Sequence, residues 1–168
     1  MIRYQTDRAW SDRFIPTIRQ IVGPLLLRTT PLMLDRNEAT DLMMLTAQDM
    51  RIACRIRRPG FVEQFGHQFT MRSQLHTSGR KTEIHKIVDG YGDWMLYGHA
   101  LTPNGPKLKK WMVIDLNAWR YHIKNHLKHI DWGERPNRDQ ETSFVWFDIR
   151  TFPSNPPILV SEGMGTNQ

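Results

Sequence analysis

The chain is predicted to form one mixed α/β domain of the α+β kind, with a β-hairpin and meander core flanked by helices. Apolar residues repeat at helical spacing in some segments and form short strand-like runs in others. Their order is helix, three strands, a short strand, helix, two strands, helix, strand. The glycine-rich phosphate loops typical of nucleotide-driven enzymes are missing from the sequence, and a mixed sheet is favoured over a doubly wound parallel one.

The N-terminal third is expected to begin with a helix over residues 7–23, in which Pro16 marks either a helix start or a kink. An extended segment over residues 24–34 contains a proline, which favours an edge strand or a bent one. Two apolar runs, 40–47 and 51–57, surround a short polar stretch. They predict a β-hairpin.

The middle of the chain alternates short strands and turns. Its predicted elements are a loop over 58–68, a strand over 69–73, a helix over 81–90, and strands over 93–100 and 111–116. Glycine ends the helix, and a turn-rich segment joins the last two strands.

The C-terminal part is predicted to hold one helix and one strand. Residues 117–130 repeat apolar side chains at helical spacing, with Asp115 or Asn117 as the cap, and residues 142–150 form a strand. The polar segment 131–141 between them is expected to be a loop. A single domain is therefore expected over residues 1–152, followed by a C-terminal tail over 153–168.

The composition is that of a soluble globular protein. Of the 168 residues, 39% are hydrophobic and 24% charged, and no apolar run approaches the length of a membrane span. The first residues lack the apolar stretch of a secretory signal. The single cysteine, Cys54, excludes an internal disulfide and suits a reducing compartment. We expect a cytoplasmic protein without a membrane partner, and the oligomeric state is left open.

The charge of the chain favours an anionic partner. The net charge is +6, arginine outnumbers lysine, and residues 51–86 hold eight basic residues against two glutamates. Arginine forks onto phosphate and stacks on bases, so nucleic acid is the first hypothesis, with DNA preferred to RNA. A merely basic surface and an acidic protein partner are the alternatives. The residues expected to contact nucleic acid are Arg51, Arg55, Arg57, Arg58, Arg72, Arg80 and Lys81.

The segment 51–57 carries the most pronounced pattern in the chain. Read with the period of a strand, Ile52, Cys54 and Ile56 point to one side, which predicts a core-facing side with a buried thiol. Arginines at 51, 55 and 57 point to the other side, which predicts a solvated face that contacts phosphate.

Four carboxylates lie close together just before this strand, Asp35, Glu38, Asp41 and Asp49. Asp41 opens an apolar run, and a carboxylate near an arginine-bearing strand is the arrangement that phosphodiester hydrolysis with Mg²⁺ requires. The structural alternative is a solvated loop, in which Asp49 caps a turn and Asp41 pairs with an arginine.

This order of elements resembles the PD-(D/E)XK nuclease-like, or restriction-endonuclease-like, fold over about residues 9–100. The stretches EATDLMML, RIACRIRRPG, FTMRS and KTEIHKIVDGYGDWMLYGH are similar to those of uncharacterised phage and prophage proteins. The resemblance implies that Asp41 begins the second strand as a Mg²⁺ ligand, and that the protein works in a host cytoplasm if phage-encoded.

The chain departs from the family motif in the next strand. An Asp/Glu-x-Lys pattern belongs there, but the corresponding residues are Ala53, Cys54 and Arg55. Arginine cannot serve as a base, although it can stabilise charge on a phosphate. An acid from elsewhere could replace the missing one, and Glu38, Asp49 or Glu83 are the candidates. A fold that binds without cutting is the alternative to an enzyme.

Two further groups have chemistry-bearing side chains. His122, His126 and His129 share one face of the predicted last helix, but the nearby lysines favour a basic surface over a zinc site. Glu83 is expected to form a solvated pair with Lys86.

Overall fold

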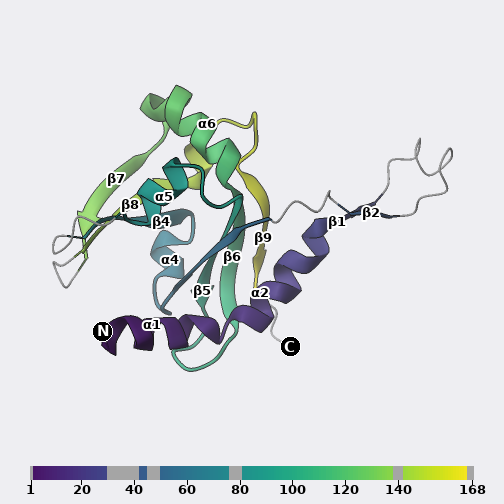
Figure 1. The fold of residues 1–168 in the computed structure, drawn as a ribbon, viewed down its shortest axis with the longest axis vertical. Coiled ribbons are helices and arrows are strands. Elements are labelled where there is room, and N and C mark those ends of the chain that lie inside the picture. Colours follow the sequence, from purple (N-terminus) through teal and green to yellow (C-terminus); the bar gives the residue numbers. More distant parts are fainter. Residues whose placement is uncertain (1, 30–41, 45–49, 76–80, 138–141, 166–168) are drawn as a thin grey trace. The chain divides into compact units, whose positions relative to one another are not determined.

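The computed structural model describes residues 2–29, 42–44, 50–75, 81–137 and 142–165. The chain divides into two compact units, Met1–Met50 and Arg51–Gln168 (Figure 1). The boundary at Met50 falls inside the single domain expected over residues 1–152.

Within its described residues, the first unit contains two helices and a short β-ribbon. Its elements are α1 (Ile2–Asp12), α2 (Ile15–Val22), the 3-10 turn η1 (Gly23–Leu26), β1 (Leu27–Thr29) and β2 (Leu42–Met44). The helix predicted over 7–23 is thus two helices, and Pro16 lies in the first turn of α2, where its fixed φ is tolerated. β1 and β2 pair antiparallel, with Leu27 opposite Met44.

The second unit is built on a mixed four-stranded sheet, which confirms the predicted mixed α+β class. Its strands are β3 (Ile52–Arg57), β5 (Trp94–Ala100), β6 (Leu108–Asp115) and β9 (Leu159–Met164), in the order β3-β5-β6-β9. β3 runs parallel to β5, and the other pairs are antiparallel. The hairpin predicted between 40–47 and 51–57 is wrong for the described residues, because β2 pairs with β1 and β3 pairs with β5.

A second, three-stranded antiparallel sheet belongs to the same unit. Its strands are β4 (Gln68–Leu75), β8 (Thr142–Asp148) and β7 (Trp132–Pro136), in the order β4-β8-β7. β7 occupies the segment predicted as a polar loop. It forms on the edge of the sheet, where a sequence with glycine, charges and proline is tolerated.

Among its described residues, the second unit also contains the α-helices α4 (Val62–Phe65), α5 (Glu83–Val88) and α6 (Leu116–His126). Of the two predicted caps, Asp115 is the one that caps α6, because its carboxylate accepts hydrogen bonds from the backbone N–H groups of Asn117 and Ala118. α6 continues into the 3-10 turn η2 (Leu127–His129) and lies at one end of the four-stranded sheet (Figure 1).

The core of the second unit draws side chains from both sheets and from α6. Every residue of β5 is buried, so this strand is covered on both faces. The main cluster consists of Phe69, Met71, Ile87, Met95, Tyr97, Met112, Ile114, Leu116, Ala118, Trp119, Ile130, Val145, Phe147 and Ile158. The last of these precedes β9, so residues 159–164 of the expected C-terminal tail form an edge strand against β6.

Candidate functional site

The arginine-bearing side of β3 faces the interior of the second unit. In the parallel register Ala53 lies beside Met95 and Arg55 beside Tyr97, and both β5 partners are buried. Ala53 packs against the main cluster. Cys54, on the other side of the strand, is exposed. The prediction of a solvated arginine face and a core-facing Cys54 is therefore wrong.

Arg55 is neutralised by a carboxylate from α5. Its Nη1 lies 2.6 Å from Oε2 of Glu83, and the two side chains are only 17% and 25% exposed. The same Oε2 accepts a hydrogen bond of 2.9 Å from the backbone N–H of Arg72 in β4. Glu83 therefore ties β3, β4 and α5 together, and it does not form the predicted solvated pair with Lys86.

The position of Glu83 follows from how α5 begins. Thr82 is the N-cap, and its hydroxyl donates to the backbone carbonyl of Ser73 at 3.0 Å. The backbone N–H of Thr82 donates to Nδ1 of His85 at 3.4 Å and the Thr82 side chain accepts from the His85 backbone, which together form a reciprocal cap. The hydrogen bond to Ser73 fixes the first turn of α5 against the edge of β4, beside Arg55.

Arg57, two residues further along β3, packs on aromatic rings. Its guanidinium carbon lies 5.5 Å from the ring centroid of Phe61 and 5.8 Å from that of Phe144. These distances are those of cation–π contacts. Arg57 is half-buried, so this packing holds its guanidinium in one place.

Phe144 belongs to a row of side chains on one face of the β4-β8-β7 sheet, the face on which buried Thr70 contacts the hydroxyl of Tyr97 at 3.3 Å. Arg72 and Arg135 flank it in register, and both are exposed. The guanidinium of Arg135 lies 5.9 Å from the ring of Trp146, the next residue on this face. We call Arg57, Arg72, Arg135, Phe144 and Trp146 the arginine–aromatic face.

Trp146 lies directly against Gly133 in β7. A Cβ at Gly133 would stand 2.9 Å from Nε1 of the indole, closer than any real Cβ contact allows. The glycine therefore leaves room for the ring on this face. Sequence reasoning missed Arg135, Phe144 and Trp146. The alternation of Phe144 and Trp146 with buried Val145 and Phe147 was the signal that could have found them.

Arg51 lies just before β3 and is held by the turn that precedes β5. Its backbone N–H donates to Oδ2 of Asp93 at 2.8 Å, and its guanidinium donates to the carbonyl of Gly90 at 3.0 Å. The backbone hydrogen bond, followed by the side-chain interactions of Arg51, lowers the pKa of Asp93 below its usual range. Arg51 therefore joins the start of β3 to the turn before β5, which is a structural role.

The remaining predicted phosphate contacts are scattered. Lys81 forms an ion pair with Asp89 at 2.5 Å, and Arg58 is exposed beside the end of β3. Arg80 lies outside the described residues. Of the six predicted nucleic-acid contacts that lie in the described part of the chain, Arg57 and Arg72 are on the arginine–aromatic face.

The predicted Mg²⁺ site falls mostly outside the described residues. Glu38, Asp41 and Asp49 all lie there, so the metal ligand role of Asp41 stays a prediction. Within the described part of the chain, no three acidic, histidine or cysteine side chains are grouped so that they could hold a metal ion.

The histidines of α6 do not share an exposed face. His122 is fully buried, and its Nε2 lies 2.7 Å from the carbonyl oxygen of Pro156. The ring of His126 is 5.5 Å away from that of His122. The second basic surface predicted from His122, His126 and His129 is therefore wrong in its first member, because α6 buries that residue with Trp119.

Comparison with models of protein families, with curated proteins and with solved structures found no match to this chain. The longest helices among the described residues have 11 residues, and none combines the length and hydrophobicity needed to cross a membrane.

Proposed function

We propose that the unit formed by residues 51–168 binds nucleic acid through the arginine–aromatic face. One observation carries the proposal: Arg57, Phe144 and Arg72 meet beside a second arginine-on-aromatic pair, Arg135 on Trp146. Guanidinium groups bind phosphate in a fork, and flat rings stack on bases. An interface that does both is typical of nucleic-acid recognition without sequence readout.

The electrostatics of the face support an anionic partner. No carboxylate within the described ranges forms an ion pair with Arg57, Arg72 or Arg135. The acid that shares this side of β8, Asp148, is 4% exposed and contacts Arg150 at 2.6 Å. The hydrogen bonds from Arg150 lower its pKa. Its charge is thus already compensated.

Fluorescence anisotropy with labelled single- and double-stranded DNA and RNA tests the proposal. The logarithm of the binding constant should fall linearly with the logarithm of salt concentration. Arg72→Ala and Arg135→Ala should each reduce the slope by about 1. Trp146→Ala should weaken binding by about 5- to 100-fold, as expected for a lost stacking contact.

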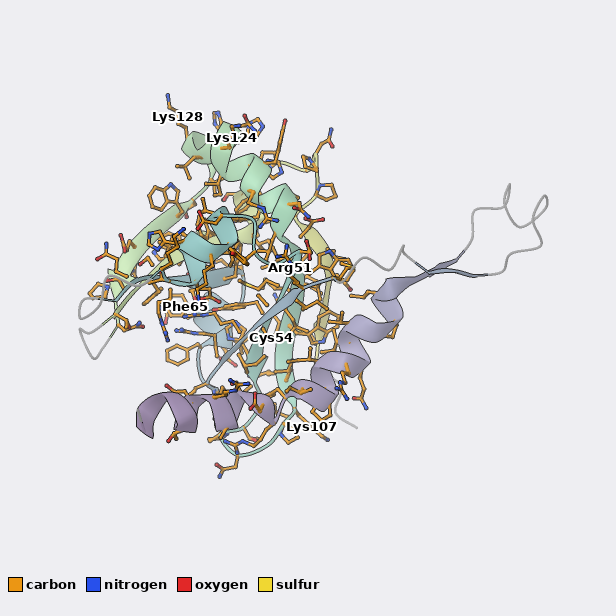
Figure 2. All side chains as sticks on the ribbon, in the orientation of Figure 1. Arg51, Cys54, Phe65, Lys107, Lys124 and Lys128 are labelled. Carbon is orange, nitrogen blue, oxygen red and sulfur yellow. The ribbon has the colours of Figure 1, made fainter. Side chains whose placement is uncertain are left out.

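The matched control is Lys107→Ala, at the end of the second unit opposite α6 (Figure 2). It removes a positive charge without touching the arginine–aromatic face. Binding that is absent at low salt, or that falls equally in the Lys107 and Arg135 variants, would contradict the proposal. Salt-sensitive binding to an acidic protein but to no nucleic acid would favour the alternative partner.

A second candidate function is Mg²⁺-dependent phosphodiester hydrolysis. The observation that favours it is the Arg55–Glu83 contact of 2.6 Å, because Glu83 supplies an acid beside the strand that lacks one. Its Oε2 holds Arg55 and the Arg72 N–H, and Oε1 has no hydrogen bond to a described residue. A free carboxylate oxygen is what a metal ligand requires.

Cleavage of DNA and RNA with Mg²⁺ or Mn²⁺ tests this candidate in the wild type, Asp41→Ala and Glu83→Gln. Both variants should lose cleavage, while binding of the same substrates in Ca²⁺ persists. Thermal melts must show that each variant is folded. Cleavage that survives Asp41→Ala would rule out Asp41 as the metal ligand and, with it, this candidate.

A further inference from the structure

A groove opens where α6 ends and β7 begins. Its volume is about 570 Å³, within the roughly 300–1,000 Å³ of ligand sites. It lies over the junction of α6, η2 and the first residue of β7. The lining residues are Ile123, Lys124, Asn125, Leu127, Lys128, His129 and Trp132.

The groove is cationic. Lys124, Lys128 and His129 line it, and its lining contains no carboxylate. Figure 2 shows Lys124, near the end of α6, and Lys128, in η2, close together at the top of the second unit. Ammonium groups at such positions act as point charges for phosphate. The charge is therefore complementary to an anionic ligand.

Trp132 adds a flat surface to these charges. Its ring is stacked on Phe147 in the core, with the centroids 6.5 Å apart and an interplanar angle of 27°. The residue nevertheless stays 44% exposed. The indole is thus supported from the core side while much of its surface remains open to a ligand.

We propose that this groove takes one unpaired nucleotide of a nucleic-acid ligand. The base stacks on Trp132 above the apolar side chains of Ile123 and Leu127, and its phosphate pairs with the lysines. Asn125 donates its amide N–H to the carbonyl of Tyr121 at 2.8 Å, which leaves its Oδ1 to accept from a base. The proposal rests on the proposed function and narrows its substrate class to nucleic acid with a single-stranded segment.

The location of Trp132 links the groove to the arginine–aromatic face. Trp132 is the first residue of β7 and Arg135 is the fourth, about 10 Å further along the strand. β7 is the outer strand of its sheet among the described elements. A single strand leaving Arg135 can therefore pass over this edge to Trp132. An acidic peptide would satisfy the lysines but would leave the indole without a flat partner.

Anisotropy with two probes tests the inference. One is a blunt DNA duplex, and the other is the same duplex with a four-nucleotide dT overhang. The wild type should prefer the overhang by about tenfold, the effect of one stacked base. Trp132→Ala and the double variant Lys124→Ala/Lys128→Ala should lose this preference and keep their affinity for the blunt duplex. Trp132→Phe should retain part of it, and Lys107→Ala all of it.

The outcomes separate the two proposals. Equal affinity for both probes in the wild type, or a preference untouched by Trp132→Ala, would overturn the groove as a nucleotide site while leaving the arginine–aromatic face intact. Loss of all binding in the wild type would instead remove the proposed function itself.

Fluorine NMR of protein labelled with 5-fluorotryptophan gives a direct readout. The Trp132 resonance is assigned from Trp132→Phe, and thymidine monophosphate and a short polyglutamate peptide serve as probes. A shift of that resonance with the nucleotide supports the inference. A shift with the peptide alone, or no shift with either, would overturn it.

Discussion

We predict that His99 makes the stability of the second unit depend on pH between about pH 6.5 and pH 4. Its ring is 2% exposed, and neither nitrogen has a hydrogen-bond partner among the described residues. In register it lies between Arg57 in β3 and Lys110 in β6. Burial, followed by the charges of Arg57 and Lys110, lowers the pKa of His99 from 6.5 to about 4, against a weak opposing effect of Glu63.

The sign follows from which state binds the proton. In the unfolded chain His99 takes up a proton below a pH of about 6.5, whereas in the folded protein it stays neutral until the pH reaches about 4. The folded state therefore has its full stability, as far as His99 is concerned, above pH 6.5, and it loses stability as the pH falls from 6.5 to about 4. At 1.36 kcal/mol for each pH unit, the whole interval corresponds to about 3 kcal/mol.

Urea unfolding of the wild type and His99→Gln at pH 7 and near pH 4.5 measures this quantity. The glutamine does not titrate. Between pH 7 and pH 4.5, the free energy of unfolding of the wild type should therefore fall by about 2 kcal/mol more than that of the variant. The cost of the substitution itself cancels, because only the change with pH is compared. The carboxyl groups of Asp93 and Asp148, whose pKa values are also lowered, are present in both proteins.

Equal losses in the two proteins would refute this account of His99. A histidine NMR titration provides an independent check, since the His99 ring signals should stay constant from pH 7 down to about pH 5. A His99 resonance that titrates near 6.5 would show that the ring is hydrated or paired in solution.

Three other substitutions test the contacts around the candidate site. Glu83→Gln leaves the guanidinium of Arg55 without its counter-charge, and urea unfolding should show a loss of about 2 kcal/mol. Asp115→Ala removes the cap of α6 and should cost about 1 kcal/mol by the same assay, whereas Asp115→Asn should cost less. Gly133→Ala should push Trp146 off β7 and weaken nucleic-acid binding severalfold in anisotropy. Unchanged affinity there would mean that the position of the Trp146 ring is unimportant.

The elements that sequence predicted best are those with long, regular apolar patterns. β5, β6 and α6 lie close to where periodicity placed them, although β6 begins at Leu108, before the predicted residue 111. β5 is buried along its whole length, and β6 and α6 each bury part of their residues in the core. β7 escaped prediction since its five residues include glycine, proline and two charges. β7 is stabilised by pairing with β8, and the pairing partner of a strand cannot be predicted from its local sequence.

Which strands pair with each other could not be predicted from the sequence either. The runs at 40–47 and 51–57 are neighbours along the chain, which favoured a hairpin. β3 instead pairs in parallel with β5, across a connection that contains α4, β4 and α5. A parallel pair requires such a crossover, but periodicity cannot say which distant strand will supply the partner. The candidate carboxylates Glu38, Asp41 and Asp49 lie outside the described residues, so their part of the site stays a prediction.

Period-2 alternation separates the two faces of a strand without revealing which one is inside. For β3 the charge pattern favoured solvent for the arginines, because an unpaired buried guanidinium is costly. In the structure, residues of other elements offset this cost. Glu83 forms an ion pair with Arg55, and the rings of Phe61 and Phe144 pack against the guanidinium of Arg57. None of these partners can be inferred from the strand itself. Two arginines that are neighbours on one side of β3 thus have different surroundings: Arg55 is held in an internal ion pair, and Arg57 packs on the arginine–aromatic face.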